Sequence, residues 1–302
     1  MRHTTFRQLE IFEAIARHRS FTRAADSLYL TQPTVSMQVR KLTDAIGVPL
    51  VEQVGKKIVV TEAGQDLALA ARDIFAILDH FEMRVAERRG LQRGHLRLVA
   101  ITTASYFAPR LLGEFGRRYP GIELSLRVTN REQVLASIAE NLDDLYILGQ
   151  PPDDIEVVAT PFMDNPLVVI AAPDHPLAGE RAISLARLAA EPWLMREAGS
   201  GTRKAIERLF AAQGLEIRPR LELGSNEAIK QAVLAGLGIS ALSSQALNLH
   251  QSGQFAILDG EGFPILRHWY AAFPAGREPS PVARSFLEFL LEAPQAGPRP
   301  LP

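Results

Sequence analysis

Near the amino terminus, apolar residues recur at the spacing of two short amphipathic helices joined by a tight turn. The first helix is expected over residues 22–28. The second is expected to begin after Thr31, a good N-cap residue, and it tolerates Pro33 because proline is accepted in a first helical turn. Three apolar residues at i, i+4 and i+7 predict its buried face: Val35, Val39 and Leu42. The pattern predicts a helical pair with one buried and one polar face.

A longer helical pattern follows the pair. Thr61 is a good cap for a helix expected over residues 62–88, a rod of about 40 Å. Its apolar residues alternate at spacings of four and three, which predicts a short heptad seam: Leu67, Ala71, Ile74, Leu78, Phe81 and Val85. We expect the seam to pair with a second copy of the chain, because a rod between two domains has no evident surface of its own to cover it. Packing on its own domain is the alternative.

From His95 onward, apolar runs of strand length alternate with helical segments. This alternation predicts mostly parallel sheets with helices on both faces. Two such sets with crossing connections predict two lobes and a cleft: lobe 1 over about 95–163 and 267–292, and lobe 2 over about 164–266. Strands are expected over 96–101, 122–128, 145–148, 167–172, 193–195, 220–223, 238–242 and 266–273. Helices are expected over 104–119, 132–141, 202–213, 226–235 and 282–291.

Charge changes this picture, because it is unevenly distributed. Residues 1–60 hold nine Lys and Arg against five Asp and Glu, a net of +4, whereas the remaining 24 basic and 29 acidic residues give −5. A basic head on an acidic body is typical of a protein that docks one end on nucleic acid. The second helix adds a polar outer face suited to base edges and phosphates in a major groove: Gln32, Thr34, Ser36, Met37, Gln38, Arg40 and Lys41.

Composition weighs against other classes of protein. The chain has no cysteine, which excludes disulfides, thiolate zinc sites and cysteine nucleophiles, and its seven histidines lack metal-ligand spacing. It has no Gly-x-Ser-x-Gly elbow, no His-Glu-x-x-His and no complete P-loop, so we expect neither an enzyme nor a metal site. No apolar run approaches a membrane span and no signal-peptide core begins the chain, so we expect no membrane association and a cytoplasmic location. A solute-binding protein fits the body but needs an export signal.

Five blocks of the first ninety residues occur in the order and spacing of a known family: residues 6–12, 20–25, 31–36, Gly47 with Leu50, and 61–64. Through these blocks the chain resembles the LysR-type transcriptional regulators. The resemblance implies a winged helix-turn-helix DNA-binding domain over 1–60 and a linker and dimerisation helix over 61–90. It further implies a two-lobed, periplasmic-binding-protein-like α/β effector-binding domain over 91–302. The implied partners are double-stranded promoter DNA and further copies of the chain, as a homodimer through the linker helix within a homotetramer. We expect an activator; a dimer without further assembly and a repressor are the alternatives.

Specific residues follow from the resemblance and from the polar face of the second helix. We expect DNA contacts in that helix and, against phosphate, in the wing: Gln32, Pro33, Thr34, Ser36, Met37, Gln38, Arg40, Lys56 and Lys57. Met37 stands where the family commonly has arginine. Fewer phosphate contacts would make the affinity less dependent on salt.

Three predicted strand-to-helix turns, at 102–105, 199–203 and 224–227, carry the chemistry that a small anion needs. Each offers backbone N–H groups, hydroxyl or amide groups and the positive end of a helix, and Arg203 adds a bidentate donor. Ordinary helix caps are the alternative, because Ser, Thr and Gly are common there. With weaker candidates at later strand ends, the predicted effector contacts are Thr102, Thr103, Ser105, Asn130, Gly149, Gln150, Gly201, Thr202, Arg203 and Asn226.

The body resembles one branch of the family, the regulators of RuBisCO and Calvin-cycle operons, over residues 103–115 and 143–152. This resemblance implies promoter binding modulated by a small anionic effector, such as a sugar phosphate, phosphoenolpyruvate or a nicotinamide nucleotide, with no resident cofactor. It favours control of a carbon-fixation operon. The alternatives are control of another metabolic operon and, on the fold alone, a metabolite-processing α/β enzyme.

Overall fold

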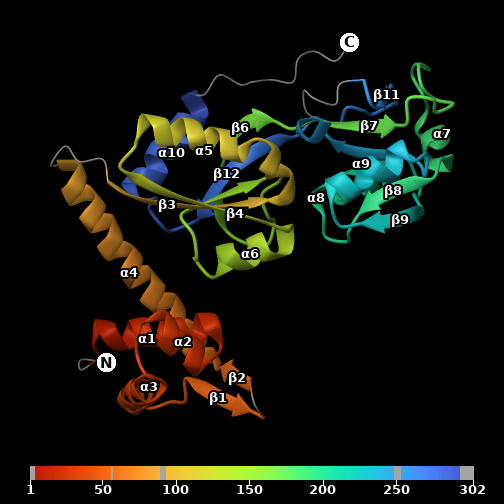
Figure 1. Ribbon diagram of the computed structural model, residues 1–302. Helices are drawn as coiled ribbons and strands as arrows, with labels where there is room; N and C mark the ends of the chain where they lie inside the picture. Colours follow the sequence, from red (N-terminus) through yellow and green to blue (C-terminus); the bar gives the residue numbers. More distant parts are fainter. Residues whose placement is uncertain (1–3, 56, 89–92, 248–252, 293–302) are drawn as a thin grey trace. The chain divides into compact units, whose positions relative to one another are not determined.

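The computed structural model describes residues 4–55, 57–88, 93–247 and 253–292. The chain divides into two compact units, Met1–Val85 with Glu140–Leu142, and Ala86–Ala139 with Asp143–Pro302. Figure 1 labels most of the helices and strands of both. Within the described residues, no helix combines the length and the apolar character that crossing a membrane requires.

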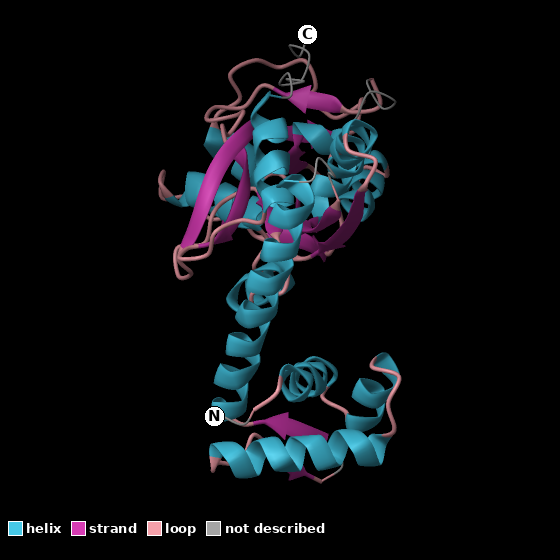
Figure 2. Ribbon diagram, turned by 90° about the vertical axis from the view of Figure 1, so that its left-hand side faces the viewer, coloured by secondary structure: helices cyan, strands magenta, loops and turns pink. Residues whose placement is uncertain are grey.

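The first unit is a winged helical module whose helices begin at side-chain caps. Thr5 forms a capping box with Gln8, and Thr31 accepts a hydrogen bond from the backbone of Thr34. Figure 2 shows these helices in cyan, with the magenta strands of the wing beside them. The elements are α1 (Phe6–His18), α2 (Phe21–Ser27), α3 (Gln32–Ile46), antiparallel strands β1 (Val51–Val54) and β2 (Lys57–Val60), and α4 (Glu62–Arg88).

The apolar face predicted for the second helix of the pair forms part of this unit's core. Val35, Val39 and Leu42 of α3 are buried in one cluster with Phe12 and Ile15 of α1. α3 ends at Gly47, whose φ of +88° is the left-handed conformation that favours glycine at a helix end. Because the apolar stripe faces inward, the polar stripe of α3 faces outward, as predicted.

The seam predicted along α4 is divided between two environments. Leu67 and Ala71 belong to the core of the winged module itself, so they do not form the predicted intermolecular seam. The first turns of α4 pack within this unit because α1 and the wing supply apolar partners there. Farther along, Ile77 and Phe81 are 63% and 57% exposed, and Leu78 is also exposed. The large apolar side chains that α4 exposes among its described residues therefore lie in its second half.

In the second unit, lobe 1 is built on a five-stranded sheet of order β4-β3-β5-β12-β6. α5 and α10 lie over one face of the sheet and α6 over the other (Figure 1). The strands are β3 (Gly94–Ile101), β4 (Ile122–Thr129), β5 (Leu145–Leu148), β6 (Val157–Asp164) and β12 (His268–Pro274). The helices are η1 (Thr102–Tyr106), α5 (Ala108–Arg118), α6 (Arg131–Ala139) and α10 (Pro281–Glu292).

Lobe 2 holds a three-stranded sheet of order β10-β7-β11 and a parallel pair, β8 with β9. Trp193 and Phe210 meet edge to face in its core. Its strands are β7 (Leu167–Ala171), β8 (Trp193–Arg196), β9 (Pro219–Leu223), β10 (Ser240–Ser243) and β11 (Ala256–Leu258). Its helices are α7 (Leu185–Ala190), α8 (Gly201–Ala211), α9 (Asn226–Leu234) and η2 (Ser244–Leu247).

The strand directions differ in part from the mostly parallel sheets that the sequence predicts. β3 is parallel to β4 and β5, and a helix lies between each consecutive pair of these three strands along the chain. β12, however, is antiparallel to β5 and β6, and β7 is antiparallel to β10 and β11. A parallel neighbour requires a crossover, usually a helix on the same sheet. β12 enters from the other lobe and is free of that requirement, so the order of elements along the chain does not fix its direction.

Candidate functional sites

The outward stripe of α3 carries the residues predicted to meet DNA. Gln32, Pro33, Met37 and Arg40 are exposed, and Thr34, Ser36 and Gln38 are at least partly accessible. In the wing, Lys57 is exposed, whereas Lys56 lies outside the described residues. The described members of the predicted set therefore all reach the surface, from one helix and the wing beside it.

Hydrogen bonds arrange part of this surface in advance. Gln32 Nε2 donates to Ser36 Oγ at 2.9 Å, one helical turn away, so the two side chains lie together on one face of α3. Gln38 differs, because its Oε1 accepts a 3.3 Å hydrogen bond from Gln8 of α1. Gln32 and Ser36 can replace their mutual hydrogen bond by hydrogen bonds to base edges. Gln38 also has a structural role, because its hydrogen bond to Gln8 joins α3 to α1.

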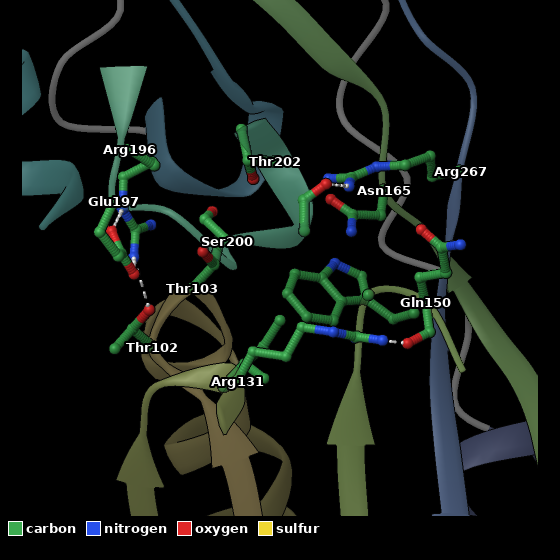
Figure 3. A pocket seen from close by; sticks show the side chains of 14 residues that line it. Thr102, Thr103, Arg131, Gln150, Asn165, Arg196, Glu197, Ser200, Thr202 and Arg267 are labelled. Atoms are coloured by element: carbon green, nitrogen blue, oxygen red, sulfur yellow. Dashed lines mark hydrogen bonds and ion pairs between the residues drawn. The ribbon is translucent and has the colours of Figure 1, made fainter. Parts of the chain in front are cut away.

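The second unit contains a pocket lined by both lobes (Figure 3), with about 450 Å³ of empty space including its opening to solvent. Six of the ten residues predicted to contact an effector line it: Thr102, Thr103, Gly149, Gln150, Gly201 and Thr202. Other lining residues were not predicted: Ile101, Arg131, Asn165, Arg196, Glu197, Ser200, Arg267 and Trp269. The pocket thus brings together loops that are far apart in the sequence.

The remaining four predicted residues are not among those that line this pocket. Ser105 Oγ donates to the carbonyl of Thr102, and Asn130 Oδ1 accepts from the backbone N–H of Gln133 at the start of α6. Asn130 therefore caps a helix start, and Ser105, inside η1, bonds back to the first residue of that short helix. Asn226 is buried and forms hydrogen bonds that join the two lobes, described below. The side chains at these three positions form hydrogen bonds within the fold itself.

Arg203, predicted as a bidentate donor for an anion, is already paired. Its Nε donates to Glu207 at 2.7 Å, and its Nη1 donates to Glu222. These two hydrogen bonds raise the pKa of the Arg203 guanidinium above its ordinary value. Because its charge is met by two carboxylates, Arg203 has little left to offer a ligand in this arrangement.

Two other arginines carry the positive charge of the pocket. Arg131 donates to the backbone carbonyls of Gln150 and Pro151, at 2.7 and 3.4 Å, and Arg267 donates to the carbonyl of Gly201 at 3.1 Å. In the described part of the chain, neither guanidinium is hydrogen bonded to a carboxylate. Burial lowers the pKa of Arg131, and burial followed by repulsion from Arg131 lowers the pKa of Arg267 to about 10. Both remain charged at neutral pH, which makes this end of the pocket attractive to an anion.

Three buried polar atoms of residues that line the pocket have no hydrogen-bond partner within the described chain: Asn165 Oδ1, Arg267 Nε and Trp269 Nε1. A buried donor or acceptor without a partner costs roughly 1–3 kcal/mol, so such atoms are uncommon in native proteins. Asn165 and Arg267 belong to the segments that connect the lobes, and Trp269 lies near the start of β12. A polar ligand in the pocket could satisfy those that it reaches.

The other end of the pocket is a hydrogen-bonded bridge between the lobes. Arg196 of lobe 2 donates to Asn226 Oδ1 at 2.6 Å and to Thr102 Oγ1 of lobe 1 at 3.3 Å. Asn226 in turn donates to Thr103 Oγ1 at 3.1 Å. The same guanidinium holds Glu197 through two hydrogen bonds of 2.7 and 2.8 Å. Figure 3 shows Arg196 and Glu197 on one side of the pocket, and Arg267, Asn165 and Gln150 on the other.

Some of the unpredicted residues had a signal in the sequence. Arg131 closely follows β4 and Arg196 ends β8, positions where ligands of open α/β sheets bind. Asn165 and Arg267 had no such signal in the sequence, because they lie on segments between the lobes whose role depends on how the lobes fold together. The described residues contain no group of three or more His, Asp or Glu side chains placed to share a metal ion.

A winged helical module joined to a two-lobed α/β unit with a pocket between the lobes is the architecture of ligand-responsive bacterial transcriptional regulators. The family model described as "Bacterial regulatory helix-turn-helix protein, lysR family" matches residues 6–65, and "LysR substrate binding domain" matches residues 89–295. The chain therefore belongs to the LysR family of transcriptional regulators. It is a DNA-binding regulator with an effector-binding domain, and not an enzyme.

Individual relatives agree along nearly the whole chain. The HTH-type transcriptional activator CmpR of Synechocystis is 52% identical over 96% of both chains, and the RuBisCO operon transcriptional regulator of Allochromatium vinosum is 51% identical over 96% of both. The solved regulatory domain of Synechocystis CcmR in complex with 2-PG is 52% identical with a TM-score of 0.64, covering 66% of this chain and 96% of that one. A full-length OxyR variant from Pseudomonas aeruginosa has a TM-score of 0.75 at 23% identity, covering 96% and 94%, and shows the likeness of fold.

Proposed function

We propose that this regulator controls a carbon-fixation operon and that a small phosphorylated acid, bound between the lobes, modulates its promoter binding. The relatives with RuBisCO operon or CmpR in their names support the operon assignment at 49–52% identity. The observation that carries the ligand assignment is the pair Arg131 and Arg267, two charged groups that line one pocket without a carboxylate hydrogen bond in the described residues.

The polar atoms of the pocket favour an anion over a neutral or cationic ligand. Arg131, Arg267 Nε and Trp269 Nε1 are donors, and Ser200 and Thr202 with their hydroxyls also line the wall. Hydrogen bonds to a charged group contribute roughly 1.5–3 kcal/mol each, about twice as much as neutral ones. A phosphate has enough acceptor oxygens to use several of these donors together.

Of the three ligand classes that the sequence left open, the comparison with the CcmR complex favours the small phosphorylated acids. The 2-PG of the CcmR complex, 2-phosphoglycolate, belongs to the small class.

We propose the division of labour that the sequence suggests: a DNA-binding domain over 1–60, a linker helix over 61–90 and an effector-binding domain over 91–302. Promoter contacts are assigned to α3 and the wing, and dimerisation to the exposed half of α4 around Ile77 and Phe81. The dimers would assemble into a tetramer, acting on DNA in the cytoplasm. The effector would shift the balance between two arrangements of the effector domains, and hence the bend of the bound DNA, by binding one arrangement better than the other.

A calorimetric titration of the full-length protein with 2-phosphoglycolate and phosphoenolpyruvate tests the ligand assignment. Wild type is expected to bind at least one of them, and Arg267→Met is expected to weaken binding by roughly 10- to 100-fold, since a charge-assisted hydrogen bond and a buried charge are lost. Arg218→Met is the matched control, because Arg218 is exposed and lines neither this pocket nor the adjoining one that Arg267 also lines. Absence of binding by wild type, or equal binding by Arg267→Met, would overturn the assignment.

A further inference from the structure

We propose that Glu197 is a built-in competitor for the effector. Its carboxylate occupies the hydrogen-bonding edge of the Arg196 guanidinium, so that only a ligand with a second acidic group displaces Glu197 from Arg196. The proposal rests on the pocket being the effector site. It makes Glu197 a specificity-determining residue that separates ligands with one anionic end from ligands with two.

The first support is the geometry of the pair. Arg196 Nε and Nη2 reach the two carboxylate oxygens of Glu197 at 2.7 and 2.8 Å, which is the bidentate arrangement that a ligand carboxylate would adopt. The remaining nitrogen, Nη1, is held by Asn226, and Nη2 also reaches Thr102. Arg196 is therefore fixed in place, and the edge of its guanidinium that could receive a carboxylate already has one.

The second support is the difference in burial between the partners. The Arg196 side chain is only 4% exposed, whereas the Glu197 side chain is 31% exposed and lines the pocket. Glu197 can move into solvent and regain hydration, but Arg196 cannot follow. A buried guanidinium must keep an anionic partner, because removing one partner of a buried pair leaves a costly uncompensated charge. Exchange of one carboxylate for another meets that condition.

The third support is the contrast between the two ends of the pocket. Arg131 and Arg267 form no hydrogen bond to a carboxylate among the described residues, whereas Arg196 forms two to the carboxylate of Glu197. Figure 3 shows Arg196 and Arg267 on opposite sides of the pocket. An anion with a single charged group is expected to settle at the Arg131 and Arg267 end and leave Glu197 in place. A phosphorylated acid is expected to place phosphate there and to use its carboxylate at Arg196.

The test compares one-ended and two-ended probes by calorimetry on the full-length protein: inorganic phosphate, and 2-phosphoglycolate with phosphoenolpyruvate. Glu197→Gln is expected to bind a two-ended probe about tenfold more tightly than wild type, while its affinity for inorganic phosphate stays within about twofold. Glu207→Gln is the matched control, because Glu207 is paired with Arg203 and does not line the pocket. It is expected to leave both affinities unchanged.

A second variant separates contact from the general electric field. Glu197→Asp keeps the charge but shortens the side chain by one methylene, so it weakens the bidentate contact while leaving the field largely unchanged. It is expected to raise the affinity for a two-ended probe, as Glu197→Gln does, but by a smaller factor. It also keeps a carboxylate near Arg196, which guards against loss of folding in Glu197→Gln.

The outcomes are distinct. Equal tightening for inorganic phosphate and the two-ended probes would reduce Glu197 to a background charge and overturn the proposal. Unchanged or weaker binding of the two-ended probes in both variants would make Glu197 a structural partner of Arg196 and overturn it as well. If wild type binds none of the probes, the proposed effector site is wrong, and so is the proposed role of Glu197. If wild type binds the two-ended probes but neither variant binds them more tightly, only the proposed role of Glu197 is wrong.

Discussion

The phenol of Tyr106 in lobe 1 donates a 2.7 Å hydrogen bond to the carboxylate of Glu227 in lobe 2. The Tyr106 ring packs against the apolar cluster of lobe 2 around Ile229 and Val233. Lys230, itself buried, lies 2.6 Å from Glu227 and 5.2 Å from the centre of the ring. These contacts, together with the hydrogen bonds of the Arg196 bridge, hold the two lobes against each other.

The Glu227 contact predicts a pH dependence of stability. Burial tends to raise the pKa of Glu227, but hydrogen bonds from Lys230 and Tyr106 outweigh it and lower the pKa below the ordinary 4.5. A lowered pKa in the folded protein means that the contact stabilises fully above about pH 4.5 and is lost as pH falls through the lowered value. Glu227→Gln should therefore reduce the free energy of unfolding at pH 7 by an amount that shrinks below pH 4.5. Urea denaturation across this range measures it, and a difference independent of pH would contradict the prediction.

Arg267 predicts a trade between stability and binding. Burial, and then repulsion from Arg131, lower its pKa to about 10, so at neutral pH the charged guanidinium costs the folded protein free energy that it does not cost the unfolded chain. Arg267→Met should remove that cost, partly offset by loss of the hydrogen bond to Gly201. We expect the ligand-free variant to be more stable by about 1 kcal/mol in urea denaturation. Destabilisation by about 2 kcal/mol or more would show that Arg267 is primarily structural.

The surface of α3 predicts two separable effects on DNA binding. Gln32→Ala and Ser36→Ala should each cost about 1–3 kcal/mol of specific promoter affinity and leave binding to random DNA largely unchanged. Lys57→Ala, in the wing, should instead weaken both kinds of binding and reduce the salt slope by about 1. Fluorescence anisotropy with promoter and scrambled duplexes at several salt concentrations distinguishes them. Equal losses on both duplexes for Gln32→Ala would contradict base reading by α3.

The exposed half of α4 predicts the site of dimerisation. Phe81→Asp should weaken self-association, because it places a charge in the proposed apolar interface, to which the exposed Ile77 and Leu78 are also assigned. Glu82→Gln, on the same helix and also exposed, is the control. Sedimentation analysis should show smaller species for Phe81→Asp than for wild type at the same concentration. Unchanged assembly would place the interface elsewhere.

The sequence predicts the winged module well because its signals are local. Thr31, the apolar stripe of α3 and Gly47 together determine where one helix begins, which face it buries and where it ends. The pattern does not predict β6, because Pro161 lies within it and proline interrupts a strand pattern. The structure explains how Pro161 is accommodated: β6 is the edge strand of its sheet, where a missing N–H is tolerated.

The sequence predicts the pocket only in part, for a related reason. Turns such as the one at Thr102 and Thr103 carry a local signal, whereas Arg267 and Asn165 acquire their role only when the lobes fold together. The glycine-rich turn before α8 leads to the prediction that Arg203 contacts the ligand. Its partner Glu207, however, lies one turn later at i+4, a spacing typical of an intrahelical ion pair. That spacing is visible in the sequence and favours the structural role.

The most direct test of the account measures promoter affinity with and without 2-phosphoglycolate, for wild type and for Arg267→Met. Coupling between two sites typically changes affinity by about 5- to 150-fold. We predict a change of this order for wild type and none for Arg267→Met, with both proteins binding the promoter equally when no ligand is added. If the phosphorylated acid shifts DNA affinity equally in both proteins, or in neither, the claim that this pocket controls the regulator is contradicted.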